Sequence, residues 1–245
     1  KYFLAVASFF IYSHISLGQV YPGQMDSTFV PVRSHHYDPE LTFDFCVNEP
    51  AWSNQAGIHS AFGSTDRLYF RKEVPVNHDN DLSSSYSTTV WRGERANAQI
   101  LVWSSEALEQ VRVSTQDLRS AEGNIIPKDR ITFELVRYVL SNYPYAEKKA
   151  ICGESPYKSG FLMPDRFETL DRFDLPSQTT RPVWMMVDVP RGTVPGTYKG
   201  QVEVRAKGKA PQLLNLEIVV QNQLLPYPKD WKLSLIHISE PTRRS

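Results

Sequence analysis

Acidic side chains gather between Pro164 and Leu175, where they could in principle perform acid–base chemistry. The acids are Asp165, Glu168, Asp171 and Asp174. Hydrolases that use paired carboxylates need the two carboxyl groups at a defined separation, which nothing in this spacing fixes. Arg166 and Arg172 interleave with the acids. Because neighbouring opposite charges pair, we predict local salt bridges and solvated charge here rather than a catalytic pair.

A second oxygen-rich stretch, Asn77 to Asp81, contains side chains that calcium accepts as ligands. It lacks the glycine and the distal bidentate glutamate of a recognised calcium loop. We therefore predict a solvated turn. The chain has only two cysteines, Cys46 and Cys152, and their spacing matches no metal-ligand motif. The sequence predicts no metal site and no cofactor.

The stretch from Trp91 to Arg95 combines a glycine with adjacent opposite charges just before a predicted strand. It favours a structural charge cluster, with a sugar subsite as the alternative. The tryptophans that could stack on sugar rings are Trp52, Trp91, Trp103, Trp184 and Trp231. Trp103 and Trp184 fall within predicted strands, where a core position is expected. We place no catalytic residue on this chain, and its substrate-binding residues stay unassigned.

The N-terminus resembles an export signal. Lys1 precedes an apolar run from Tyr2 to Tyr12 that is too short to span a bilayer as a helix. Small residues then allow cleavage between Gly18 and Gln19, so we expect residues 1–18 to be a signal peptide. An uncleaved membrane anchor is the alternative. Cleavage would give a periplasmic or secreted bacterial protein with no remaining membrane segment.

Export would place Cys46 and Cys152 in an oxidising compartment, where a disulfide can form. Two buried free thiols are the alternative. Lys plus Arg number 27, as do Asp plus Glu, so no positive excess is present to neutralise a phosphate backbone. Nucleic acid is therefore not expected as a partner.

Apolar residues alternate with polar ones in several short runs, the pattern of half-buried strands. The clearest runs are Ala96–Val102, Val111–Val113, Ile131–Leu135, Gln201–Lys207 and Leu214–Val220. Val183–Val189 is apolar on both faces and predicts a central strand. No long helical stripe competes with these runs. The expected fold is all-β, an antiparallel sandwich of immunoglobulin-like or jelly-roll-like type.

The domain is expected to span residues 19–232, with its most regular part at 88–223. Proline-rich Ser141–Thr180 predicts a long irregular loop, which serves as an interface, a binding surface or a cover over one end of the sandwich. Residues 224–232 contain two prolines and predict a stiff exit linker leading to a further domain.

The last residues, 233–245, are expected not to be native. Leu233 to Arg243 corresponds codon by codon to a transposon adapter used to prepare sequencing libraries. Such a scar is excluded from reasoning about fold or chemistry, which removes His237 and Glu240 from consideration.

Several motifs occur together in a characteristic order along Thr88 to Lys232. They are Arg92-Gly93-Glu94, Pro164-Asp165, Arg181 to Trp184, Val187 to Pro190, Pro195 to Gly200 and Leu225 to Trp231. This ensemble resembles the N-terminal domain of proteins related to glycoside hydrolase family 123. The resemblance implies a sandwich that precedes a catalytic β/α barrel. It also implies hydrolysis of N-acetylgalactosaminides, with an adjacent Asp-Glu pair in the barrel as catalytic residues.

No Asp-Glu dipeptide occurs in the chain, and a β/α barrel needs about 250 residues of its own. We therefore expect this chain to be inactive by itself and the intact parent to be a glycosidase acting on N-acetylhexosamine-containing glycans. Its expected partner is the downstream catalytic domain of the same chain. Alternatives are a carbohydrate-binding or adhesion module, whose partners would be glycans, and a structural spacer.

Overall fold

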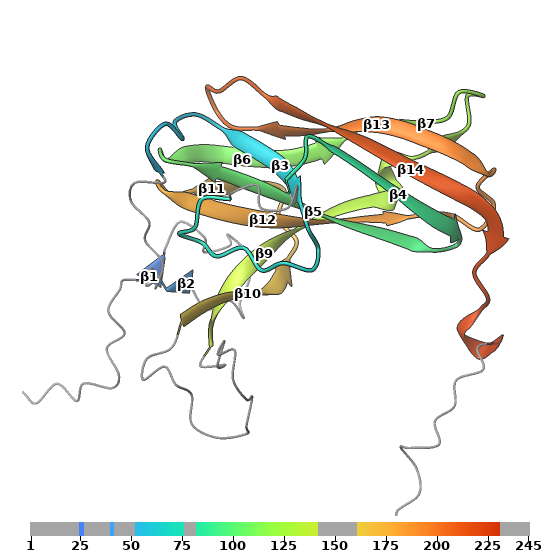
Figure 1. Ribbon diagram of the computed structural model, residues 1–245, viewed down its shortest axis with the longest axis horizontal. Helices are drawn as coiled ribbons and strands as arrows, with labels where there is room; N and C mark the ends of the chain where they lie inside the picture. Colours follow the sequence, from blue (N-terminus) through green and yellow to red (C-terminus); the bar gives the residue numbers. More distant parts are fainter. Residues whose placement is uncertain (1–24, 27–39, 42–51, 76–81, 142–160, 231–245) are drawn as a thin grey trace, which may run out of the picture.

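The computed structural model describes residues 25–26, 40–41, 52–75, 82–141 and 161–230. This part of the chain forms β-strands in two large sheets that pack face to face (Figure 1). A separate ladder joins β1 (Met25–Asp26) to β2 (Glu40–Leu41). The predicted all-β sandwich is confirmed. Within these residues no helix is long and apolar enough to cross a membrane.

One sheet has five strands in the order β10-β9-β12-β5-β3, all antiparallel. Its strands are β3 (His59–Gly63), β5 (Arg95–Ser104), β9 (Ile131–Ser141), β10 (Phe161–Glu168) and β12 (Thr179–Asp188). β12 is central, as its apolar sequence predicts. Pro182 is tolerated in this central strand because β9 pairs with β12 only from Val183 onward.

The other sheet has seven strands. They are β4 (Ser85–Arg92), β6 (Leu108–Thr115), β7 (Leu118–Arg119), β8 (Ile125–Ile126), β11 (Phe173–Leu175), β13 (Gly196–Arg205) and β14 (Gln212–Leu224). β13 covers the predicted run Gln201–Lys207 as far as Arg205, β14 contains the predicted run Leu214–Val220, and the two strands pair as an antiparallel hairpin. β4 pairs with β14 in parallel, unlike the antiparallel expectation. The reason is that β4 continues through a tight corner into β5 of the other sheet, so no hairpin sets its direction.

The main core lies between the two sheets. Alternate residues of β5, namely Ala96, Ala98, Ile100 and Val102, face inward and are buried. The predicted apolar faces of β13 and β14 meet them from the opposite sheet. The two-residue periodicity therefore identifies the inner faces of these strands correctly.

A smaller core covers the outward side of β5. Leu101 and Trp103 pack there against residues of segment 52–75, namely Trp52, Ala61, Tyr69 and Val74. The Trp103 indole N–H donates to Gln55 Oε1 at 2.8 Å. The parts of segment 52–75 on either side of β3 thus cover one part of the outer face of the five-stranded sheet. The predicted core position of Trp103 is confirmed.

The expectation of an irregular Ser141–Thr180 is wrong for its described part. Residues 161–180 contain β10, β11 and the start of β12. Prolines hid these strands from the sequence pattern. β10 is an edge strand that includes Pro164, with a register shift between Pro164 and Arg166. Edge strands accept proline because one side of their backbone makes no ladder hydrogen bonds. Residues 142–160 lie outside the described part.

Candidate functional site

The carboxylates of residues 165–174 do not converge on a common site. Glu168 of β10 pairs with the buried Arg137 of β9. Asp171 lies 3.0 Å from Arg112 of β6, and Asp174 accepts a backbone hydrogen bond from β6 at 2.8 Å. The predicted local pairing is present between Arg172 and Asp171 at 3.8 Å, whereas the other partners come from neighbouring strands. Because Glu168 is bound to one sheet and Asp171 and Asp174 to the other, these three acids do not form a catalytic pair.

Other predicted residues lie outside the described part of the chain. These are Gly18, Gln19, Cys46, Cys152 and Asn77 to Asp81. The cleavage site, the disulfide and the solvated turn therefore stay predictions. Among the residues that the structure does describe, no cluster of His, Cys, Asp and Glu could hold a metal ion.

The corner between β4 and β5 is built around Gly93, whose φ of 84° requires glycine's conformational freedom. The Gly93 N–H donates to Val189 O at 3.0 Å, and the Val189 N–H donates to Glu94 O at 3.0 Å. A Glu94 carboxylate oxygen accepts from the Trp91 N–H at 2.7 Å. The corner is thus a structural cluster that joins both sheets at one end of the sandwich.

The chain leaves the sandwich at this corner through residues 224–230, here called the exit segment. The Leu225 N–H donates to Arg92 O at 2.9 Å, and Arg191 Nη1 donates to Leu225 O at 2.5 Å. The Arg191 guanidinium also lies over the Tyr227 ring. The segment ends in a short 3₁₀ turn, Pro228–Asp230. Arg191 follows β12, so the exit segment passes from β14 of one sheet to the end of the other (Figure 1).

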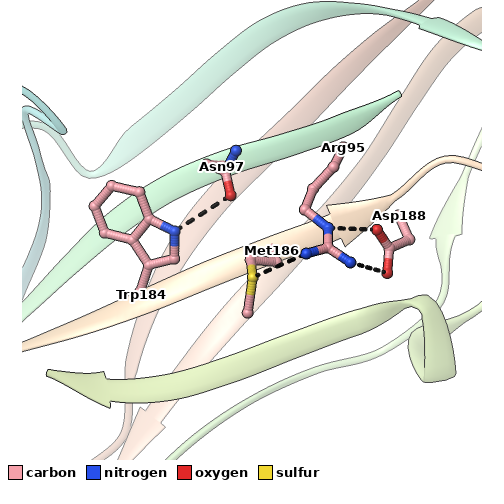
Figure 2. A network of polar contacts seen from close by, with 5 residues as sticks. All are labelled: Arg95, Asn97, Trp184, Met186 and Asp188. Atoms are coloured by element: carbon pink, nitrogen blue, oxygen red, sulfur yellow. Dashed lines mark hydrogen bonds and ion pairs between the residues drawn. The ribbon is translucent and has the colours of Figure 1, made fainter. Parts of the chain in front are cut away.

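The outer face of the five-stranded sheet carries an array of side chains beside this corner (Figure 2). Two nitrogens of Arg95 bond to Asp188, at 2.6 and 3.1 Å, and a third lies 3.6 Å from the Met186 sulfur. The carboxylate of Asp188 raises the pKa of Arg95, mainly by accepting its hydrogen bond. The Trp184 indole N–H donates to Asn97 Oδ1 at 3.2 Å.

The prediction that Trp184 belongs to the core is wrong. In the second half of β12, Val183, Met185 and Val187 face the core, so Trp184 lies on the outward face, where it is half-buried. Its ring lies 5.6 Å from that of Phe167, which is 50% exposed. These outward side chains of the five-stranded sheet form what we call the outer patch: Arg95, Asn97, Phe167, Trp184, Met186 and Asp188.

The outer face of the seven-stranded sheet has a different character. Lys199 and Glu217 form an ion pair at 3.0 Å, and Ser87 donates to the same glutamate at 3.0 Å. Lys199 and Ser87 lower the pKa of Glu217 through these hydrogen bonds. Gln201 and Asn215 bond to each other at 3.2 Å. This face carries these polar pairs beside the exposed Leu213, whereas the outer patch gathers two aromatic rings, so the outer patch and the exit segment form the candidate interface.

Comparisons with known proteins agree with the sequence motifs. A solved structure of a family 123 glycoside hydrolase from Clostridium perfringens, studied for glycolipid glycan hydrolysis, matches with a TM-score of 0.61 and 21% identity. The match covers 71% of this chain and 29% of that chain, so this chain spans less than a third of the enzyme. At this identity the match shows the shared fold.

A PapD-like domain of human CEP192 also matches, over 79% of this chain and 99% of that domain, at 12% identity and a TM-score of 0.35. No curated protein matches the chain. The family model of the glycoside hydrolase 123 N-terminal domain matches residues 62–206, from β3 through β13. The sandwich described above therefore belongs to the family of glycoside hydrolase 123 N-terminal domains.

Proposed function

We propose that this chain is the non-catalytic N-terminal domain of an exported glycosidase, and that it supports a catalytic barrel that follows the exit segment. The observation that carries the proposal is the family match over residues 62–206. The matched enzyme is also much longer than this chain, which covers 29% of it. An N-terminal domain of this kind would contribute to hydrolysis by supporting the catalytic barrel that follows it.

The chemistry of the chain supports a non-catalytic role. Three of the clustered acids, Glu168, Asp171 and Asp174, are bound to neighbouring strands, and the sequence contains no Asp-Glu dipeptide. Hydrolysis would therefore rest on residues of the barrel. The family resemblance supports N-acetylhexosamine-containing glycans as substrates. The signal peptide expected at residues 1–18 would place the reaction in the periplasm or outside the cell.

A carbohydrate-binding module is the second candidate function. The observation that favours it is the outer patch, in which Trp184 and Phe167 present ring surfaces beside the Asn97 amide. Aromatic faces flanked by hydrogen-bonding groups suit sugar rings. Under this alternative the domain holds the glycan itself.

Parallel assays on this chain and on the longer protein encoded by the uninterrupted gene test the first proposal. The substrate is a chromogenic N-acetylgalactosaminide. We expect hydrolysis by the longer protein and none by this chain. Hydrolysis by this chain, or a longer protein that cleaves no N-acetylhexosaminide, would contradict the proposal.

Export is tested separately by expressing the gene with its leader and sequencing the N-terminus of the product. We expect the mature chain to begin at Gln19 and to occur in the periplasm or the medium. A product that keeps residues 1–18 and sediments with membranes would instead establish the anchor.

A further inference from the structure

We propose that the outer patch of the five-stranded sheet is the surface on which the following catalytic domain docks. This inference rests on the proposed function, because it assumes that such a domain exists. It adds which face of the sandwich meets that domain and which side chains form the centre of the contact.

The composition of the outer patch is that of a protein interface. Interface centres are enriched in aromatic residues, methionine and arginine. Trp184, Phe167, Met186 and Arg95 provide all of these on neighbouring strands. The opposite face of the sandwich instead carries the ion pair of Lys199 and Glu217 and further polar pairs. Each face carries one exposed ion pair, so burying either costs hydration of charges, but the outer patch adds the ring surfaces of Trp184 and Phe167 as apolar area.

The charges within the outer patch are already satisfied inside the domain. Arg95 makes both of its short hydrogen bonds to Asp188, and the Trp184 N–H has its acceptor in Asn97. A partner that covers the patch therefore leaves the Trp184 N–H and the two N–H groups of Arg95 that face Asp188 with their hydrogen bonds. The tilted contact of Trp184 with Phe167 also fixes both rings before docking, which reduces the entropy lost in forming the interface.

The path of the exit segment brings the chain to this face. It begins at the end of β14, in the seven-stranded sheet, and is fastened by Arg191, three positions after Asp188 of the outer patch. In Figure 1 it leaves the right-hand end of the sandwich and turns toward the side of the view where β9 and β10 lie. Phe167 belongs to β10. A domain that begins just beyond Asp230 therefore starts at the end of the sandwich where Arg95 and Asp188 of the outer patch lie, close in sequence to Arg92 and Arg191.

Hydroxyl-radical footprinting of the longer protein and of this chain provides the test, because tryptophan and methionine side chains are readily oxidised when exposed. We expect oxidation of Trp184 and Met186 to fall on the order of tenfold in the longer protein. Leu213, which is 53% exposed on the opposite face, is the internal control and should change less than about twofold. Equal oxidation of Trp184 in both proteins would overturn the proposal.

A matched pair of variants provides a second test. Met186→Glu places a charge in the outer patch, and Leu213→Glu places one on the opposite face. Met186→Glu should lower the temperature at which the longer protein loses hydrolase activity and leave the unfolding temperature of this chain unchanged. Leu213→Glu should leave both unchanged. Equal effects of the two variants on the longer protein would count against docking at the patch.

The outcomes separate the two proposals. A longer protein that is active but leaves Trp184 fully oxidised retains the proposed function and loses the docking surface. A longer protein that protects Trp184 but hydrolyses no aminosugar glycoside retains docking and loses the function. If this chain binds N-acetylhexosamine oligosaccharides and Trp184→Ala abolishes the binding, the outer patch is a glycan site and the docking proposal fails.

Discussion

The guanidinium carbon of Arg191 lies 4.0 Å from the centre of the Tyr227 ring. The same guanidinium donates to the Leu225 carbonyl at 2.5 Å. One side chain from the loop after β12 therefore holds two successive parts of the exit segment. This contact sets the direction in which the chain leaves the sandwich, and it is absent from any local sequence pattern because 36 positions separate Arg191 from Tyr227.

Removal of this contact should free the exit segment while the sandwich stays folded. In Arg191→Ala, the Leu225 N–H keeps its acceptor in Arg92 but loses the neighbouring support. We expect its amide exchange to accelerate on the order of tenfold, the effect of losing about 1.4 kcal/mol. Hydrogen exchange measured by NMR checks this, with the Met185 amide of β12 as internal reference. Unchanged exchange at Leu225 would show that Arg191 does not hold the segment.

The corner glycine gives a second prediction. Gly93 and Gly123 have φ values of 84° and 85°, so alanine at either position is strained by about 1 to 2 kcal/mol. A β-carbon on Gly93 would also lie 2.8 Å from Arg191 Cγ, whereas one on Gly123 would meet no atom within 4 Å. We expect Gly93→Ala to lower the free energy of unfolding by about 1 kcal/mol more than Gly123→Ala.

Urea denaturation of both variants measures this difference. Arg191→Ala removes the Cγ atom that the new β-carbon would meet. When Arg191 is already alanine, Gly93→Ala should therefore lower the free energy of unfolding by no more than Gly123→Ala does. If Gly93→Ala and Gly123→Ala cost the same, the Arg191 contact has no energetic consequence at the corner.

The alternation of apolar and polar residues predicted those strands that have one face in the main core and the other face outside it. β5, β13 and β14 each have one face in the main core, so alternation of apolar and polar residues appears directly in the sequence. Such features depend on near neighbours along the chain.

Other features depend on contacts that local patterns do not record. Pro164 in β10 concealed an edge strand, and the parallel pairing of β4 with β14 follows from the corner at Gly93. Trp184 was assigned to the core because its strand is apolar on both faces. Only the burial of successive residues in β12 shows that Trp184 and Met186 in its second half face outward. Candidate interface residues are hard to distinguish from core residues for this reason.

The two cores on either side of β5 should respond differently to loss of side-chain volume. Ile100 and Leu101 are both fully buried, Ile100 in the main core and Leu101 beneath segment 52–75. Truncating either to alanine removes contacts worth about 2 to 5 kcal/mol. Ile100→Ala should lower the unfolding temperature of the whole sandwich. Leu101→Ala should instead loosen residues 64–75, which follow β3 and whose Tyr69 and Val74 pack on Leu101, since β3 and its Phe62 stay in the main core.

Limited trypsin digestion distinguishes these effects, because Arg67, Arg71 and Lys72 provide cleavage sites in the segment. We expect faster cleavage there in Leu101→Ala under conditions where the strands of the sandwich resist. Cleavage spread evenly over the whole chain would mean that the two cores unfold as one unit.

Segment 52–75 is also held by a carboxylate that should make its attachment depend on pH. Glu106 Oε1 accepts from Lys209 Nζ at 2.8 Å and from the Gly57 N–H at 2.5 Å. These hydrogen bonds, that of Lys209 above all, lower the pKa of Glu106 below its ordinary value of 4.5. Protonation of Glu106 should therefore weaken the contact between the segment and the β13–β14 hairpin.

A carboxyl group with a lowered pKa in the folded state stabilises the fold above its unfolded pKa, and this contribution is lost as the pH falls through the folded value. Glu106→Gln should accordingly lower the unfolding temperature near pH 7, and the difference from the unsubstituted chain should shrink as the pH falls below about 4.5. Thermal unfolding followed by circular dichroism from about pH 7 to pH 3 measures this. Lys209→Gln removes the main partner, so combining it with Glu106→Gln should add little. A difference that stays constant down to the lowest pH would show that the ionised Glu106 does not stabilise the folded chain.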